Sequence, residues 1–539
     1  MSPSPLESQT GKPSELQSSE DAIVACGEMG RYQIFLCLVL QYSAIIGAGT
    51  FALGTFGKLF PTFHCQNGHL AREDYMATHT PQYECLIAHD DCRNRTLLQR
   101  YFYSIVEEWM LVCENEYAVK IIFASLLMGR LIGNVVGGHV ADFFGRNVAL
   151  LPSQFGHCII GAMSTACTDW KALVVCLFLL GFCFGVGETT SFVLTAEATT
   201  NKYRWIQVSC FQWSLQYPIV AVIAYLSETW RMYMVIVNVI MAPVLLFYLM
   251  FLETPRFLIY SEQYDRAAEV LNDVASDRWN NKRNVNFELD DFRRIPSRNS
   301  APAEPRFNGP WILFSNWPRA KLTALLWVAM FLRSMLVGMY LQNGSSYDSN
   351  PFISMAMYGV ARIWVPIFIV LVDRKSRRFG RRIVFFIFWI IMILIVGAIT
   401  LLIALRFAAS NRTAAVYAFE VLGVLGASIA ASGGWMSLVI LSVEAYPTAL
   451  RGTSFGWLEC FNGLGNLVSP YFLRTTQTWT NLPSVVFLAT LTPVVILAYF
   501  VIPETKFQSL TDRETPAVSA TENEEAVAAK DSAPSRQNR

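Results

Sequence analysis

The chain has 539 residues, of which 53% are hydrophobic and only 15% are charged, and its formal net charge is +1. This composition is too apolar for a soluble protein of such length, and the near-neutral charge gives no support to nucleic-acid binding. We therefore expect a protein of the lipid bilayer without a nucleic-acid partner.

The first residues, 1–31, are polar and rich in Ser and Glu, which predicts a disordered tail ahead of the first apolar run. We recognise no cleavable signal peptide in this tail. The first span is therefore expected to act as its own signal anchor.

Twelve apolar runs then follow, each close to the roughly 20 residues that a spanning helix needs. In the first half, 32–252, the expected spans are Tyr32–Phe56, Tyr117–Val140, Val148–Cys167, Ala172–Thr195, Trp205–Leu226 and Met232–Leu252. In the second half, 321–502, they are Leu322–Leu341, Ile353–Val372, Ile383–Leu405, Ala414–Val443, Thr453–Phe472 and Pro483–Val501. A hydrophilic central loop, 253–320, joins the halves, and a polar tail expected to be disordered occupies 503–539. The predicted fold is an all-α membrane protein with twelve transmembrane helices in two six-helix halves.

The loop after the first span, 57–116, is rich in cysteine. Cys65, Cys85, Cys92 and Cys113 form an even set that allows three pairings as two disulfides in an extracellular loop. The alternative is a zinc site, because Cys65-x3-His69 and Cys85-x3-His89-x2-Cys92 have suitable ligand spacing. Disulfides are favoured, and no resident metal is expected, because exported cysteines usually oxidise. The remaining cysteines lie in or beside the spans and are interpreted as small buried apolar residues.

Loop charges predict the orientation. By the positive-inside rule, basic residues crowd the cytoplasmic loops, here the central loop and the loop with Arg374, Lys375, Arg377, Arg378, Arg381 and Arg382. Both termini are then cytoplasmic, in a multi-pass protein of the plasma membrane. The sequons at Asn94, Asn343 and Asn411 fall on the opposite, extracellular side and are predicted glycosylation sites.

A charged motif occurs once in each half. Glu197 precedes Arg204 at the end of the fourth span, and Glu444 precedes Arg451 with the same spacing at the end of the tenth. Two membrane-embedded halves related by a parallel repeat are typical of secondary transporters, because a site between them can open to either side.

Further motifs carry a family resemblance. The segment 138–146, GHVADFFGR, resembles the Gly-x3-Asp-x2-Gly-Arg signature of the major facilitator superfamily. The segments 27–33 (GEMGRYQ), 104–113 (SIVEEWMLVC) and 253–258 (ETPRFL) resemble the organic cation/anion/carnitine transporter family within it. The resemblance implies the major facilitator fold, transport of organic solutes by alternating access, and no ATP site.

Charges at the inner helix ends suggest a conformational latch that joins the two halves while the inner gate is shut. The candidates are Asp142, Arg146, Glu197, Arg204, Glu253, Arg256, Arg381, Arg382, Glu444, Arg451 and Glu504. The chain departs from the family at Phe143 and Asn147, where basic residues are usual, and Asp373 lies farther from Gly380 than expected. These departures predict a latch that is weaker or differently wired. The competing interpretation is that these charges only set topology.

Ionisable residues at membrane depth are candidate substrate contacts, because a charge in hydrocarbon needs a wet cavity or a partner. Glu188 and Glu459 could attract a cation. Arg362, Arg130 and Arg333 could attract an anion or neutralise those acids, for instance through an internal Glu459–Arg362 salt bridge. Candidates for stacking on a flat or quaternary cation are Trp213, Gln216 and Tyr217 in the fifth span, together with Trp435 and Trp457.

In the family that the chain resembles, the residue aligned with Gly463 is an Asp in cation carriers and an Arg in anion carriers. The residue aligned with Arg362 is commonly an acid in both classes. This chain follows neither pattern. The fourth span, with LFLLG at 177–181, also lacks the Arg common in proton-coupled relatives, which favours facilitated diffusion or exchange.

The sequence predicts a polyspecific transporter of small organic ions, with a cation or zwitterion favoured. The alternatives are an organic anion carrier, a sugar-type porter, and a non-transporting receptor or scaffold. No nucleophile, base and orienting group come together in the sequence, so we expect neither enzymatic activity nor a cofactor. The expected partners are a small organic solute and the lipid bilayer.

Overall fold

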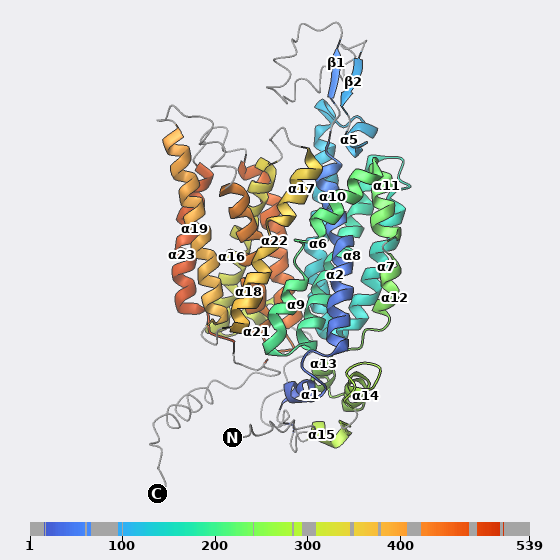
Figure 1. Ribbon diagram of the computed structural model, residues 1–539, viewed down its shortest axis with the longest axis vertical. Helices are drawn as coiled ribbons and strands as arrows, with labels where there is room; N and C mark the ends of the chain where they lie inside the picture. Colours follow the sequence, from blue (N-terminus) through green and yellow to red (C-terminus); the bar gives the residue numbers. More distant parts are fainter. Residues whose placement is uncertain are drawn as a thin grey trace, which may run out of the picture.

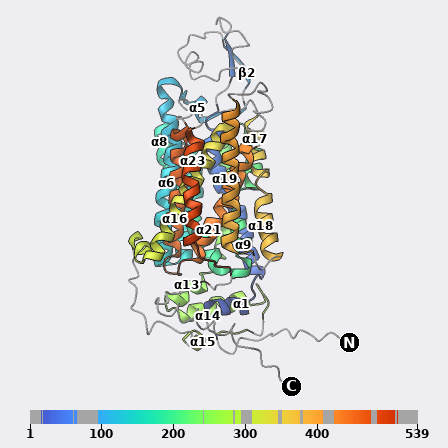
Figure 2. The ribbon, with the colours of Figure 1, turned by 90° about the vertical axis from the view of Figure 1, so that its left-hand side faces the viewer.

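The computed structural model describes residues 16, 18–59, 62–65, 95–99, 101–240, 242–282, 285–293, 309–344, 350–375, 379–406, 422–473, 482–506 and 510. Its helices run side by side in an elongated bundle (Figures 1 and 2). We call the end that carries α1, α13, α14 and α15 the inner end and the end that carries β1 and β2 the outer end. These names follow the orientation predicted from the loop charges.

The first half contains α2 (Arg31–Phe56), α6 (Glu116–Phe144), α7 (Arg146–Ser164) and α8 (Trp170–Ala198). Its fifth span consists of α9 (Arg204–Cys210) and α10 (Gln216–Ser227). Its sixth contains α11 (Trp230–Val235), the π-helix η3 (Ile236–Ile240), η4 (Ala242–Val244) and α12 (Leu245–Tyr248).

The second half contains α16 (Trp317–Gly344), α17 (Pro351–Val360) with α18 (Trp364–Lys375), and α19 (Arg381–Arg406). The tenth span includes the π-helix η6 (Ile429–Gly434) and α21 (Trp435–Glu444). It is followed by α22 (Arg451–Leu473) and α23 (Leu482–Val501). The predicted class, an all-α membrane protein with two six-helix halves, is confirmed.

Within the described residues, nine helices are long enough and apolar enough to cross a membrane, judged by their length and composition alone. The third, fifth and eleventh predicted spans are not among them. Polar residues explain two of these cases, since α7 contains Gln154 and His157, and α22 contains Glu459 and Asn462. The fifth span is divided between two shorter helices, α9 and α10.

Two spans are interrupted partway along their length. The fifth breaks at 211–215, between α9 and α10, and the eighth breaks at 361–363, between α17 and α18. Trp213 and Arg362 stand in these breaks. Discontinuous helices in membrane carriers free backbone polar groups where they line a site.

The two halves meet along α6 and α22, and again where α10 packs on α17. Glycines permit the first contact: a Cβ atom on Gly138 would lie 2.3 Å from the Gly452 carbonyl oxygen, and one on Gly456 would lie 2.3 Å from the Asn134 carbonyl oxygen. Small residues allow membrane helices to approach at the level of their backbones.

Short elements cover both ends of the bundle (Figure 2). At the outer end, β1 (Thr62–Cys65) pairs antiparallel with β2 (Arg95–Gln99), followed by α5 (Ile105–Glu108) and η1 (Cys113–Asn115). At the inner end lie α1 (Ser19–Ala25), η2 (Asn201–Tyr203), α13 (Pro255–Tyr260), α14 (Tyr264–Ala275), α15 (Leu289–Arg293) and η5 (Pro310–Phe314).

The expectation of a disordered tail over 1–31 is wrong for residues 19–25. These residues form α1, capped by Ser18, whose hydroxyl accepts from the Asp21 N–H group. Ala22 and Ile23 are buried, and the Cys26 thiol contacts the Leu271 carbonyl of α14 at 3.4 Å. The docking surface that orders this polar segment comes from a distant part of the chain.

Candidate functional site

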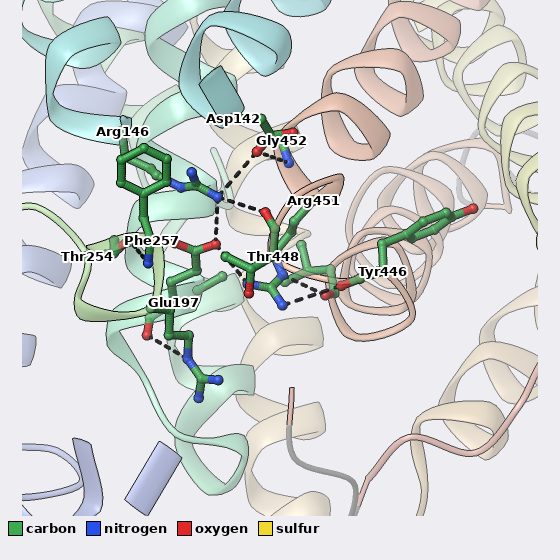
Figure 3. A network of polar contacts seen from close by, with 12 residues as sticks. Asp142, Arg146, Glu197, Thr254, Phe257, Tyr446, Thr448, Arg451 and Gly452 are labelled. Carbon is green, nitrogen blue, oxygen red and sulfur yellow. Dashed lines mark hydrogen bonds and ion pairs between the residues drawn. The ribbon is translucent and has the colours of Figure 1, made fainter. Parts of the chain in front are cut away.

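Glu197, at the inner end of α8, is fully buried and accepts hydrogen bonds from both halves (Figure 3). Its Oε1 atom lies 2.9 Å from Nη2 of Arg146 in the first half and 2.8 Å from Nη1 of Arg451 in the second. Its Oε2 atom accepts from the Thr254 hydroxyl at 2.7 Å. One carboxylate therefore holds two guanidinium groups that come from opposite halves.

Asp142 makes a second connection across this boundary (Figure 3). Its carboxylate accepts from the N–H groups of Gly452 at 3.1 Å and Thr453 at 2.7 Å, in the first turn of α22. The unpaired N–H groups and the positive end of the helix dipole favour an anion there. Arg146 reaches Asp142 at 3.2 Å and donates to the Thr448 carbonyl at 3.0 Å. The signature loop after the second span thus binds the other half directly.

Glu444, at the inner end of α21, is the counterpart of Glu197. Its Oε1 atom lies 2.6 Å from Nη1 of Arg204 in the first half and 3.3 Å from Nε of Arg381 in its own half. The Thr505 hydroxyl donates to Oε2, as the Thr254 hydroxyl does to Glu197. The motif that is repeated in the sequence therefore forms two similar networks in the structure. Each network contains one acid, one arginine from each half and one threonine.

Glu253 and Glu504 occupy equivalent positions at helix N-termini. Glu253 accepts from the first two N–H groups of α7, at 3.0 and 2.9 Å. Glu504 accepts from the first two N–H groups of α19, at 2.8 and 3.3 Å. Both carboxylates satisfy helix N–H groups beside an arginine of the cross-half networks.

The two copies differ at one acid. Asp373 pairs with Arg381 at 2.9 Å and with Lys506 at 3.0 Å, both in its own half, whereas Asp142 binds the opposite half. The departures at Phe143 and Asn147 have local consequences. Phe143 is 42% exposed, and the Asn147 side chain donates to the Phe251 carbonyl. The networks around Glu197 and Glu444 form without basic residues at 143 and 147.

Each candidate latch residue thus contacts one of these networks or their immediate supports. Arg256 donates from Nε to the Glu197 carbonyl at 3.3 Å, and Arg382 takes part through its backbone N–H. The contacts are properties of the structure, while a role in gating remains a prediction.

A second charged cluster lies near the middle of the bundle, around Arg130 of α6. Its guanidinium binds Glu188 of α8 through two hydrogen bonds, both 2.8 Å, and Glu459 of α22 through a third at 3.1 Å. Glu459 also accepts from the Trp435 ring N–H at 2.8 Å and from the Asn462 amide at 2.7 Å. All oxygens of the two acids are therefore engaged.

The internal Glu459–Arg362 salt bridge, one of the alternatives considered for these charges, does not form among the described residues, and Glu459 pairs with Arg130 instead. Arg362 instead donates to the Ser432 hydroxyl at 3.0 Å and to the Gln212 side-chain oxygen at 3.3 Å. The break between α17 and α18 directs its guanidinium toward the tenth span, whereas Glu459 faces Arg130 across the α6–α22 contact.

The aromatic candidates border this cluster. The Trp213 ring centre lies 5.7 Å from that of Phe51 and 6.3 Å from that of Tyr217, and the Arg130 guanidinium carbon lies 5.8 Å from the Trp213 ring. Gln216 donates to the Gln41 carbonyl of α2 at 3.1 Å. Trp213 thus contacts the charged cluster, Tyr217 packs on Trp213 and on Arg362, and Gln216 faces the first span.

Several polar neighbours of the cluster were not predicted from the sequence, namely Gln212, Ser432 and Asn462. Their only signal was an uncharged polar residue within an apolar run. An outer ion pair, Glu108 with Arg231 at 2.6 Å, was not predicted either, although Glu108 belongs to the segment 104–113 that carries the family resemblance.

Other candidates lie where the structure does not describe them. Cys85, Cys92, Asn94 and Asn411 are outside the described residues, as are the side chains of Cys65, Cys113 and Asn343. The two disulfides, the zinc alternative and the glycosylation sites therefore stay predictions.

Comparison with known proteins identifies the family. The family model described as sugar (and other) transporter matches residues 66–515. The chain belongs to this family. Among solved structures, the proton:xylose symporter XylE bound to 6-bromo-6-deoxy-D-glucose has 15% identity and a TM-score of 0.59, covering 89% of this chain and 98% of that chain. A partially occluded inward-open structure of XylE from E. coli has 14% identity and a TM-score of 0.51, with 89% and 100% covered. These structures confirm the fold of the transporter family.

Several curated relatives belong to one group of solute carriers. Solute carrier family 22 member 16 of Xenopus laevis is 27% identical over 410 residues, covering 75% of this chain and 69% of that protein. Member 15 of Xenopus tropicalis is 25% identical, covering 87% and 85%, and member 2 of Rattus norvegicus is 26% identical, covering 76% and 70%. The resemblance to the organic cation/anion/carnitine transporters is confirmed, and the chain is a membrane protein of the transporter family.

Proposed function

We propose that this carrier moves small organic ions across the plasma membrane by alternating access, and that the Glu197 and Glu444 networks form its inner gate. The observation that carries the proposal is the sharing of each buried acid between the two halves, at 2.8 Å to Arg451 and 2.6 Å to Arg204. Opening the inner end requires these contacts to separate.

Physical chemistry makes such a contact a two-state element. A buried ion pair that loses one partner costs about 3–5 kcal/mol, because a charge is left in a poorly solvated place. Separating the halves admits water, which solvates both partners and offsets much of that cost. The gate is therefore stable when fully shut or fully hydrated, and half-open states are disfavoured.

The central cluster is the proposed substrate site. Charged groups in the middle of a membrane bundle are costly and mark ion or substrate pathways. Here Arg130, Glu188 and Glu459 come from three helices of both halves, with Trp213 and Tyr217 beside them. Rearrangement between halves would change this pairing and couple substrate binding to the gate.

Facilitated diffusion or exchange is the proposed mode. The segment at 177–181 of the fourth span carries no ionisable residue, in contrast to the arginine common in proton-coupled relatives. Uptake should therefore follow the substrate gradient and respond to substrate preloaded on the opposite side.

The test is uptake by cells expressing the full chain, screened with labelled organic cations, zwitterions, anions and hexoses. We expect saturable uptake of at least one organic ion and trans-stimulation by preloaded substrate. Uptake confined to hexoses would favour a sugar-type porter. No uptake of any compound, with the protein present at the cell surface, would favour the non-transporting receptor or scaffold.

A further inference from the structure

Two of the arginines at mid-membrane depth have no carboxylate within ion-pair distance among the described residues. Arg333 of α16 is 4% exposed and Arg362 is 6% exposed. The described acids nearest in depth, Glu188 and Glu459, both bind Arg130. A buried guanidinium normally has an anionic partner, because desolvation of a full charge costs roughly several kcal/mol.

Neutral groups hold both arginines. Arg333 donates to the Ala430 carbonyl at 3.2 Å and to the Asn462 side-chain oxygen, and its buried Nε–H group has no hydrogen-bond partner in the described part of the chain. Arg362 donates to the Ser432 hydroxyl at 3.0 Å and to the Ala431 carbonyl at 3.4 Å. These contacts satisfy donors but neutralise no charge.

The two side chains meet at one unusual piece of backbone. Ala430, Ala431 and Ser432 all belong to the π-helix η6. A π-helical turn displaces carbonyl groups from the regular α-helical pattern, and such turns occur frequently at functional sites. Here the turn brings Arg333 from the seventh span and Arg362 from the eighth to consecutive residues of the tenth.

The charges at this depth do not cancel. Arg130, Arg333 and Arg362 supply three positive charges, and Glu188 and Glu459 supply two negative charges, so the described cluster has an excess of one positive charge (3 − 2 = 1). Tyr217 and Tyr358 flank Arg362, with ring centres 5.5 and 5.1 Å from its guanidinium carbon. An organic anion could place its charge on the arginines and its carbon skeleton against these rings.

We propose that Arg333 and Arg362 bind the anionic group, a carboxylate, of the transported solute. The inference rests on the proposed transport function and narrows it: the substrate is a zwitterion or an anion, and a simple cation lacks the group that these arginines require. A carboxylate can accept from both guanidinium groups at once, as charge-assisted hydrogen bonds.

The test uses the purified full chain and matched ligand pairs. Carnitine and its methyl ester differ in the carboxylate, as do benzoate and benzamide. We expect at least one carboxylate to raise the unfolding temperature, with its uncharged counterpart at least about tenfold weaker in the concentration required, because each charge-assisted hydrogen bond is worth a tenfold factor or more. Equal protection by ester and acid, or by amide and acid, would overturn the proposal, as would no protection by either carboxylate.

Variants separate binding from folding. Arg362→Gln and Arg333→Gln should abolish protection by the carboxylate while leaving the ligand-free unfolding temperature unchanged or higher, because each removes an unpaired buried charge. Arg362→Lys should retain part of the protection. Arg130→Gln is the matched control at the same depth. It leaves the buried carboxylates of Glu188 and Glu459 without their cation, so the ligand-free unfolding temperature of this variant should fall. A similar fall for Arg362→Gln would overturn the proposal and make Arg362 a structural residue.

The same purified protein, together with the uptake assay, tests the carboxylate site and the proposed transport function separately. A chain that transports organic cations without any carboxylate requirement fails this inference and leaves the proposed function intact. A chain that is protected by a carboxylate but transports nothing supports the site and fails the proposed function.

Discussion

Glu444 accepts from Arg204, Arg381 and Thr505, which come from three separate elements, and this convergence gives a single residue control over the inner gate. Glu444→Gln keeps the shape but removes the charge that holds both arginines. We expect the maximal uptake rate to fall about tenfold or more with little change in KM, because the residue lies far from the central cluster and acts on the conformational step.

The measurement is concentration-dependent uptake at matched surface expression. Glu116→Gln is the control, since Glu116 forms an exposed pair with Lys120 at the outer end and should have no effect. An unchanged maximal rate in Glu444→Gln would count against a latch.

Arg130 and its two acids permit a test of pairing. Arg130→Gln leaves Glu188 and Glu459 without their cation, and Glu459→Gln leaves Arg130 with one acid. Because residues in contact couple, the double variant should be more stable than the sum of the single effects predicts, by about 1–3 kcal/mol. Thermal or denaturant unfolding of the four proteins measures this coupling, and strictly additive effects would show that the pair contributes nothing.

Sequence reasoning worked better at the inner end than at the centre. The latch candidates were found because charges at helix ends repeat with fixed spacing in both halves. Partners at the centre could not be assigned, because Arg130 and Glu459 are 329 residues apart and their meeting depends on how α6 and α22 are rotated. Spacing within one helix carries no information on that rotation.

At the scale of helices, the contact between α6 and α22 depends on glycine. Gly456→Ala would place a methyl group 2.3 Å from the Asn134 carbonyl oxygen, so the helices must separate. We expect loss of most transport activity. Gly397→Ala is the matched control, because among the described residues a Cβ atom there would meet only Leu488, at 3.9 Å, and transport should be unchanged. Equal activity of the two variants would argue against close approach of α6 and α22 in the transport cycle.

The helix interruptions were not predicted. The mean hydropathy of 205–226 and of 353–372 predicts two continuous spans. A mean over residues contains no information on backbone dihedral angles, so it does not reveal a break. The break at 211–215 contains neither Gly nor Pro, and the nearest following proline is Pro218. Helix-breaking residues therefore do not predict this break. Contacts from other helices, such as Arg362 to Gln212, stabilise the breaks and are visible only in three dimensions.

For the molecule as a whole, the spans and the two halves could be predicted because apolar length and loop charge are additive along the chain. The same argument predicts the sidedness of the outer loop. If Cys65, Cys85, Cys92 and Cys113 form two disulfides, non-reducing mass spectrometry of surface protein should detect no free thiol among them. Free or zinc-bound thiols would contradict this prediction.

Orientation has an independent test. Asn94, Asn343 and Asn411 should be accessible to glycosylation, and enzymatic removal of N-glycans should increase the gel mobility of the surface protein. Replacing each Asn by Gln should remove one step of that shift wherever the site is used. A shift that persists in the triple variant would mean that other sites carry the glycans.

The helix α1 has a practical consequence for experiments on this carrier. Glu20 accepts from the Asn201 N–H group in the first half and from the Leu510 N–H group beyond the second, both at 3.2 Å, and pairs with Arg256 at 3.4 Å. Separation of the halves at the inner end must break one of the two backbone contacts. A fluorescent protein inserted next to Glu20 or Leu510 would therefore perturb the opening equilibrium that it is meant to report. Paired labels on the outer segments would leave this contact undisturbed.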